Sequence, residues 1–235
     1  MTRTTVLAFP FAGGSATSYR PLQAALPPEL AFVPCEPPGR GRRYGEALCT
    51  TMPALVDDAL AQARPHLQRG PVALFGHSMG AHLAWLLALR LRDEHLPAPR
   101  CLLLTGAAAP AARRRETPWH ALPREAFLRV LGELGGLPEA ILADPEAVAL
   151  FEPILRADLT AMETYRVPDR PPLTVPIRVL TGASETFDLP DVLAWEDVTT
   201  GPFQHETLPG SHFFLFETTA SVARWMADAL AETAE

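Results

Sequence analysis

One short motif in the chain has the pattern of a serine nucleophile on a sharp turn. Residues 76–80 read Gly-His-Ser-Met-Gly, which matches G-x-S-x-G. A strand-like apolar run, residues 72–75, comes directly before this motif, and an apolar helical pattern, residues 79–91, follows it. In that context the two glycines allow a tight turn from strand to helix, which exposes the serine hydroxyl at the edge of a sheet. The sequence therefore predicts Ser78 as a nucleophile.

A serine hydroxyl needs a base to take its proton, and a histidine usually has this role. His212 differs from the other six histidines because it lies in a tight turn, residues 209–214, between the last expected strand and the last expected helix. In proteins with such a serine turn, nucleophile, acid and base follow one another in this order along the chain. We therefore expect His212 to be the base.

A carboxylate must orient the histidine, and the chain offers two candidates. The expected strand at residues 177–180 runs into a loop in which Glu185 lies three residues after Gly182 and Asp188 lies six residues after it. Either carboxylate could hold the imidazole and stabilise its charged form. At this stage both remain open as the acid.

The oxyanion of a tetrahedral intermediate needs two backbone N–H donors. The first donor is expected at Met79, the residue after the nucleophile. The second is expected in the loop after the first strand, residues 9–14, which contains two consecutive glycines. Within this loop we favour the N–H of Ala12, with Phe11 as the alternative.

Short strand-like runs alternate with longer helical patterns along the chain. Strands are expected at residues 6–9, 32–33, 72–75, 102–104, 177–180 and 203–208, and helices at 19–26, 52–67, 79–91 and 220–231. This alternation predicts an α/β fold with a mainly parallel sheet flanked by helices on both faces. The elements that carry the candidate residues therefore end at one edge of that sheet.

A long insertion interrupts the alternation at residues 107–172, with helical patterns at 124–131, 138–142 and 145–165. We expect residues 1–106 and 173–235 to form the core of a single structural domain, and residues 107–172 to form a helical lid over the strand ends. The residues expected to contact substrate under this lid are Phe127, Leu131, Leu134 and Phe151.

The composition excludes several classes of protein. The net charge is −7, whereas binding to nucleic acid phosphates needs a basic surface. No apolar run approaches the roughly 18 residues that a membrane span needs, and the first apolar run is too short for a signal peptide. Three scattered cysteines without a C-x-x-C pattern are typical of free thiols. We therefore expect a soluble cytoplasmic protein.

Five segments together resemble the type II thioesterases, the discrete editing enzymes that accompany polyketide and nonribosomal peptide synthases. The resemblance spans nearly the whole chain and follows the family's order, and it implies an α/β-hydrolase fold with Ser78 and His212 as nucleophile and base. The segments are residues 9–14, 38–42 followed by Glu46, 76–80, 156–159 and 210–214.

The acid loop departs from the family pattern. Members usually have an aspartate three residues after the glycine, where this chain has Glu185. The resemblance favours Glu185 over Asp188, because the spacing from Glu185 to Trp195 matches the family. The histidine loop reads Gly-Ser-His where Gly-Gly-His is commoner, which is a milder change.

The resemblance implies hydrolysis of acyl thioesters on the phosphopantetheine arm of acyl or peptidyl carrier proteins, without a metal or other cofactor. We expect the protein to be a monomer. Three consecutive arginines at residues 113–115 are a candidate docking patch for such a partner. A free-standing carboxylesterase or lipase is an alternative, because nucleophile turn and triad are the same there. A non-catalytic protein of the same fold that binds a synthase is another.

Overall fold

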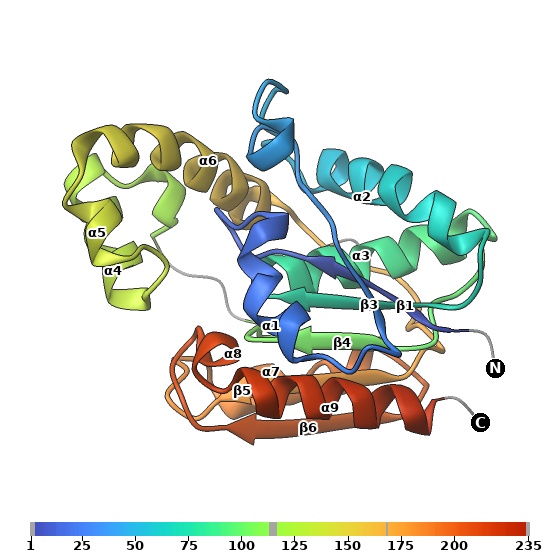
Figure 1. The fold of residues 1–235 in the computed structure, drawn as a ribbon. Helices are drawn as coiled ribbons and strands as arrows, with labels where there is room; N and C mark the ends of the chain where they lie inside the picture. Colours follow the sequence, from blue (N-terminus) through green and yellow to red (C-terminus); the bar gives the residue numbers. More distant parts are fainter. Residues whose placement is uncertain (1–2, 113–116, 168, 234–235) are drawn as a thin grey trace.

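The computed structural model describes residues 3–112, 117–167 and 169–233, so the arginine cluster at 113–115 lies outside the described residues. A six-stranded sheet forms the centre, with strand order β2-β1-β3-β4-β5-β6, and every neighbouring pair is parallel. Its strands, drawn as arrows in Figure 1, are β1 (Thr5–Phe9), β2 (Ala31–Pro34), β3 (Val72–His77), β4 (Leu102–Thr105), β5 (Ile177–Gly182) and β6 (Phe203–Leu208).

Helices cover both faces of the sheet. On one face α2 (Met52–Leu67) and α3 (Met79–Asp93) pack against apolar side chains of the strands, and on the other face α1 (Arg20–Ala25) and α9 (Thr219–Glu232) do so. Shorter elements complete this core: α7 (Leu189–Leu193), α8 (Phe214–Glu217) and the 3-10 turns Ala16–Tyr19, Gly41–Arg43 and Glu196–Val198.

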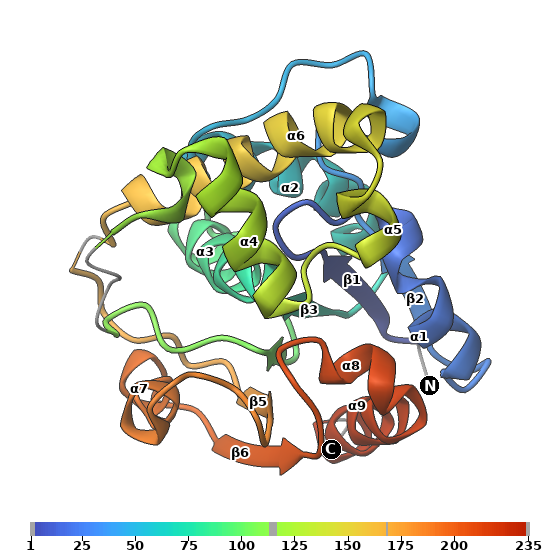
Figure 2. The ribbon, with the colours of Figure 1, turned by 90° about the vertical axis from the view of Figure 1, so that its left-hand side faces the viewer.

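Between β4 and β5 the chain forms a helical insertion. It contains the 3-10 turn Trp119–Ala121 and the helices α4 (Arg124–Leu134), α5 (Glu139–Leu142) and α6 (Pro145–Thr164). Figure 1 places these helices beyond the arrowheads of the strands, and Figure 2 looks onto this carboxyl edge with α4 and α6 above it. A separate apolar cluster holds the inserted helices together. We call the described residues of 107–172 the helical insertion.

The expected α/β class and parallel sheet are confirmed, and the sheet is parallel throughout rather than mainly parallel. All six expected strands are present, with β2 extending over four residues instead of two. Helix α8 was not expected, because it spans four residues directly after the histidine turn and has no periodic signal of its own. Within the described ranges, no helix is both long enough and apolar enough to cross a membrane.

Candidate active site

Ser78 lies between the end of β3 and the start of α3 in a strained backbone conformation, with φ 54° and ψ −117°. Such a conformation costs roughly 1–3 kcal/mol and persists only where the surroundings enforce it. A Cβ atom at Gly76 would overlap the backbone of Gly80, and one at Gly80 would overlap the backbone of Phe9. The two glycines therefore allow the close packing of strand and helix that the turn needs.

The histidine loop and the acid loop follow the neighbouring strands β6 and β5. The N–H of Ser184 donates to the carbonyl oxygen of Gly210 at 2.9 Å, which joins the two loops. This contact brings Glu185 beside His212, and Oε2 of the carboxylate lies 2.9 Å from Nδ1 of the ring. Both side chains are nearly buried, with exposed fractions of 6% and 7%.

This hydrogen bond determines the tautomer of the His212 ring. A carboxylate can only accept, so Nδ1 of His212 donates to Glu185 and Nε2 of the neutral ring is free to accept a proton. The other oxygen, Oε1 of Glu185, is buried and has no hydrogen-bond partner among the described residues. Asp188, the alternative acid, is exposed at the N-terminal end of α7 and makes no contact of this kind in the structure as described. The geometry thus brings Glu185 to the imidazole.

His77 is fully buried beside His212, with ring centroids 5.1 Å apart. The hydroxyl of Thr105 donates to the carbonyl oxygen of Gly76, so it accepts from Nδ1 of His77 at 2.9 Å. Burial lowers the pKa of His77 well below its usual value, and the nearby His212 lowers it further. His77 is therefore neutral, which avoids repulsion when His212 takes up a proton.

The two expected oxyanion donors belong to segments that meet at the nucleophile. Met79 is the first residue of α3, so its backbone N–H has no acceptor within the helix. In the loop after β1, the N–H of Gly14 donates to the carbonyl oxygen of Phe11 at 2.8 Å and closes a turn with Ala12 at its first corner. For the N–H of Ala12, no acceptor is found in the part of the chain that the structure describes. The assignment of both groups to an oxyanion hole stays a prediction.

A cavity of about 710 Å³ opens at this edge of the sheet. Ser78, His212, Phe11 and Ala12 line its reactive end. The rest of the wall is mainly apolar and comes largely from α3, the helical insertion and the loop before α7. Volumes of roughly 300–1,000 Å³ with a few polar groups are typical of small-molecule sites. The wall residues include Trp85, Leu86, Leu131, Leu134, Leu155, Leu159, Met162 and Phe187.

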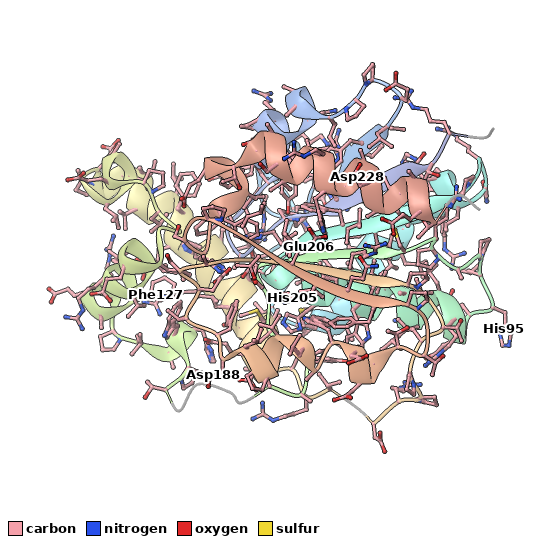
Figure 3. All side chains as sticks on the ribbon, turned by 90° about the horizontal axis from the view of Figure 1, so that it is seen from below. His95, Phe127, Asp188, His205, Glu206 and Asp228 are labelled. Atoms are coloured by element: carbon pink, nitrogen blue, oxygen red, sulfur yellow. The ribbon has the colours of Figure 1, made fainter. Side chains whose placement is uncertain are left out.

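Of the four side chains expected to contact substrate, two line this cavity and two do not. Leu131 and Leu134 of α4 face it. Phe127 is fully buried inside the helical insertion (Figure 3), where the guanidinium of Arg156 lies 4.1 Å from its ring centroid. Phe151 is exposed.

The reasons why these two side chains lie away from the cavity are geometric. Phe127 lies on the side of α4 that packs against α6, where it joins Leu155 and Leu159 in the core of the insertion. Phe151 lies one turn before Leu155 on α6, beyond the part of the helix that reaches the cavity. Apolar periodicity identifies the buried side of a helix but does not distinguish a cavity wall from a core.

The sequence analysis missed the contribution of α3 to the cavity wall. His82, Trp85 and Leu86 all line the cavity. They follow Ser78 by four, seven and eight residues, which is the spacing of one helix face. The signal was therefore present, because the face of α3 that continues from the nucleophile has to border the same space.

The parallel sheet flanked by helices, the serine on a strained strand-to-helix turn and the histidine bonded to a carboxylate are the features of a serine hydrolase of the α/β-hydrolase fold. Comparison with known families specifies this class further. The Thioesterase domain family matches residues 4–230. The chain belongs to the thioesterase family.

Similar proteins come from biosynthetic pathways. A probable cadicidin biosynthesis thioesterase of Streptomyces griseus is 34% identical over 226 residues, which are 96% of this chain and 62% of that protein. RedJ, a thioesterase from the prodiginine biosynthetic pathway of Streptomyces coelicolor, is 36% identical, with TM-score 0.88 over 97% of this chain and 89% of that chain. BorB, a type II thioesterase from the borrelidin biosynthetic cluster, is 35% identical, with TM-score 0.84 over 97% and 92%.

Proposed function

We propose that this protein is a type II thioesterase that removes acyl chains from the phosphopantetheine arms of acyl or peptidyl carrier proteins. Its role is editing: it releases stalled or aberrant chains during the synthesis of a polyketide or nonribosomal peptide. The observation that carries the proposal is the position of Ser78 and His212 at one end of a large apolar cavity, in a chain of the thioesterase family. The similarity to BorB and RedJ supports the pathway.

The first half of the reaction forms an acyl-enzyme. Nε2 of His212 takes the proton of the Ser78 hydroxyl while Oγ attacks the thioester carbonyl carbon. Glu185 holds the imidazole and stabilises its positive charge. The oxyanion accepts hydrogen bonds from the N–H groups of Met79 and Ala12. The intermediate collapses, the C–S bond breaks, and His212 returns its proton to the departing phosphopantetheine thiol.

The second half hydrolyses the ester. His212 takes a proton from water, the hydroxide attacks the acyl carbonyl, and the same two donors hold the second oxyanion. The C–O bond to Ser78 then breaks and the serine oxygen recovers its proton. This sequence uses only side chains and backbone groups of the chain itself.

The helical insertion acts as the lid of the acyl site in this proposal. Leu131 and Leu134 of α4 and Leu155 and Leu159 of α6 line the cavity, so an acyl chain on Ser78 can bury its apolar surface against them. The acyl chain on its carrier arm enters under this lid, and Phe187 of the loop before α7 borders the same cavity. The three cysteines are free thiols, which supports a reducing compartment such as the cytoplasm.

Matched substrates test the proposal. The purified protein is given an acyl group as a carrier-protein thioester and as a p-nitrophenyl ester, and kcat/KM is measured for both. We expect the carrier-protein thioester to be preferred by at least about tenfold, with turnover of both lost in Ser78→Ala. A strong preference for the oxygen ester would identify a carboxylesterase instead. A wild-type protein that hydrolyses neither substrate and fails to react with a fluorophosphonate would identify a non-catalytic protein.

A further inference from the structure

A buried ion pair joins the helical insertion to the turn after β2. Arg40 and Asp158 are 3% and 0% exposed, and both terminal nitrogens of the guanidinium contact the carboxylate, with Nη2 lying 2.6 Å from Oδ1. Burial raises the pKa of Asp158 above its ordinary value, although Arg40 and the N–H of Gly13 act in the opposite direction. Because desolvation opposes such pairs, a buried ion pair is weak evidence for stability. A third group contacts both side chains of this ion pair and indicates another role.

That group is the backbone of the loop after β1. The N–H of Gly13 donates to Oδ2 of Asp158 at 2.8 Å, and Arg40 donates to the carbonyl oxygen of Gly14 at 3.4 Å. Helix α6 also packs its Leu155, one turn before Asp158, against the same place, since a Cβ atom on Gly13 would overlap that side chain. One face of α6 therefore holds the loop by a hydrogen bond and by packing.

The hydrogen bond to Gly13 selects one form of the turn. Gly14 bonds back to Phe11, and the φ of +80° at Gly13 marks a type II turn. In a type I turn the peptide between Ala12 and Gly13 is rotated by about 180°, so its carbonyl oxygen instead of its N–H would point toward the carboxylate. Asp158 stabilises the first orientation and repels the second. The bond thereby fixes the orientation of the peptide between Ala12 and Gly13, and it holds the N–H of Ala12, which belongs to the preceding peptide, through the shared Cα atom.

We infer that Asp158 is a positioning residue of the oxyanion-binding loop: it holds Gly13, and through it the N–H of Ala12, while Arg40 orients the carboxylate. The inference rests on the proposed function for the role of Ala12. Neither side chain of the ion pair lines the cavity in the structure as described, so the effect passes through the backbone. A displacement of about 1 Å at such a donor can lower the rate by about 100-fold.

The test separates the hydrogen bond from the charge pair. Two double variants are compared, Arg40→Met with Asp158→Leu and Arg40→Met with Asp158→Asn. Both remove both charges, and apolar replacement of a buried ion pair is often neutral or stabilising. Only the asparagine retains an oxygen that can accept from Gly13. Arg178→Met, which removes another buried arginine on β5, serves as the control.

We expect the leucine variant to lower kcat by about 10- to 100-fold at nearly unchanged KM and with intact cooperative unfolding. The asparagine variant should recover at least about fivefold of this loss, and Arg178→Met should keep the wild-type kcat. Equal kcat values in the two double variants, or a wild-type kcat in the leucine variant, would overturn the inference. If the leucine variant does not fold, Arg40→Met with Asp158→Ala takes its place in the same comparison.

A second readout keeps the inference separate from the thioesterase assignment. Labelling by a fluorophosphonate needs the nucleophile and the oxyanion donors but no thioester. If the protein hydrolyses oxygen esters and not thioesters, the proposed function fails, yet the labelling rates of the two double variants still differ if Asp158 positions the loop. Equal labelling rates in a protein that does hydrolyse thioesters would instead remove the positioning role alone.

Discussion

The two regions that meet at the cavity are held in place by different kinds of contact. At the strand ends, Ser78 owes its conformation to glycines two residues away on either side. In the helical insertion, several polar contacts join residues far apart in the sequence. Asp158 bonds Arg40 across 118 positions, and the carboxylate of Glu163 accepts from the backbone and ring of His120 across 43.

The two regions also differ in what they contribute to the proposed active site. In the proposed mechanism the strand ends supply the reactive side chains, whereas the helical insertion supplies apolar wall and, through Asp158, a hydrogen bond to the loop after β1. We therefore expect kcat to be most sensitive to changes at the strand ends. Stability and substrate binding should be most sensitive to changes in the insertion. The following variants examine this division, beginning with the largest expected effect.

Replacement of the nucleophile should separate activity from stability completely. Ser78→Ala removes the attacking oxygen, so we expect kcat to fall by at least about 10⁴-fold. The alanine keeps the strained backbone of the turn, so the melting temperature should stay within a few degrees of wild type. Turnover, labelling by a fluorophosphonate and thermal unfolding measure these effects. Residual labelling in this variant would show that another residue is the nucleophile.

The acid should have the next largest effect. Glu185→Gln replaces the carboxylate that accepts from His212, so the imidazole loses its orientation and the partner for its charge. We expect kcat to fall by about 10²- to 10⁴-fold. Asp188→Asn is the matched control, because this exposed residue borders the cavity without contacting the imidazole, and its kcat should remain within about threefold of wild type. The reverse result would make Asp188 the acid.

The same division explains which features could be predicted from the sequence. The nucleophile turn was predictable because its glycines, the preceding strand and the following helix are neighbours in the chain. His212 was predictable because it follows the last strand directly. The residues alone left Glu185 and Asp188 open because both lie in one loop, and only the family resemblance favoured Glu185. In the structure the contact between the loops after β5 and β6 brings Glu185 to the ring.

The helical insertion shows the limit of sequence periodicity. Its three helices were predicted, but the residues of α4 and α6 that face the cavity were predicted only in part, because the apolar residues of these two helices serve both as core and as wall. The partner of Asp158 was equally hidden. Arg40 lies 118 positions away, and no local pattern indicates that the two side chains are buried together.

Two phenylalanines of the insertion test how this region contributes to stability. Phe127→Ala removes a fully buried ring between α4 and α6, so we expect the free energy of unfolding to fall by about 3–5 kcal/mol. Phe151→Ala changes an exposed side chain of the same type, and its effect should stay within about 0.5 kcal/mol. Urea unfolding of both variants provides the measurement. Similar losses in the two would contradict the assignment of Phe127 to the core of the insertion.

The smallest predicted effect is a dependence of stability on pH that originates at the strand ends. Because burial lowers the pKa of His77 in the folded state, the unfolded chain binds the proton more readily once the pH falls below the ordinary value of about 6.5. The contribution of this residue to stability is complete above that pH and is lost progressively below it. Between pH 7 and pH 5.5 the loss should be about 1 kcal/mol.

The variant His77→Gln isolates this contribution. Burial also lowers the pKa values of His66 and His205, but both residues are present in wild type and variant, so their contributions cancel in the difference. Unfolding in urea at pH 7 and pH 5.5 should therefore show a smaller loss of stability in His77→Gln than in wild type, whatever the absolute stability of the variant. Equal losses would mean that His77 takes up a proton as readily in the folded protein as in the unfolded chain. In that case a charged His77 could lie beside His212. The neutrality of His77 would then not explain how His212 can accept a proton at this position.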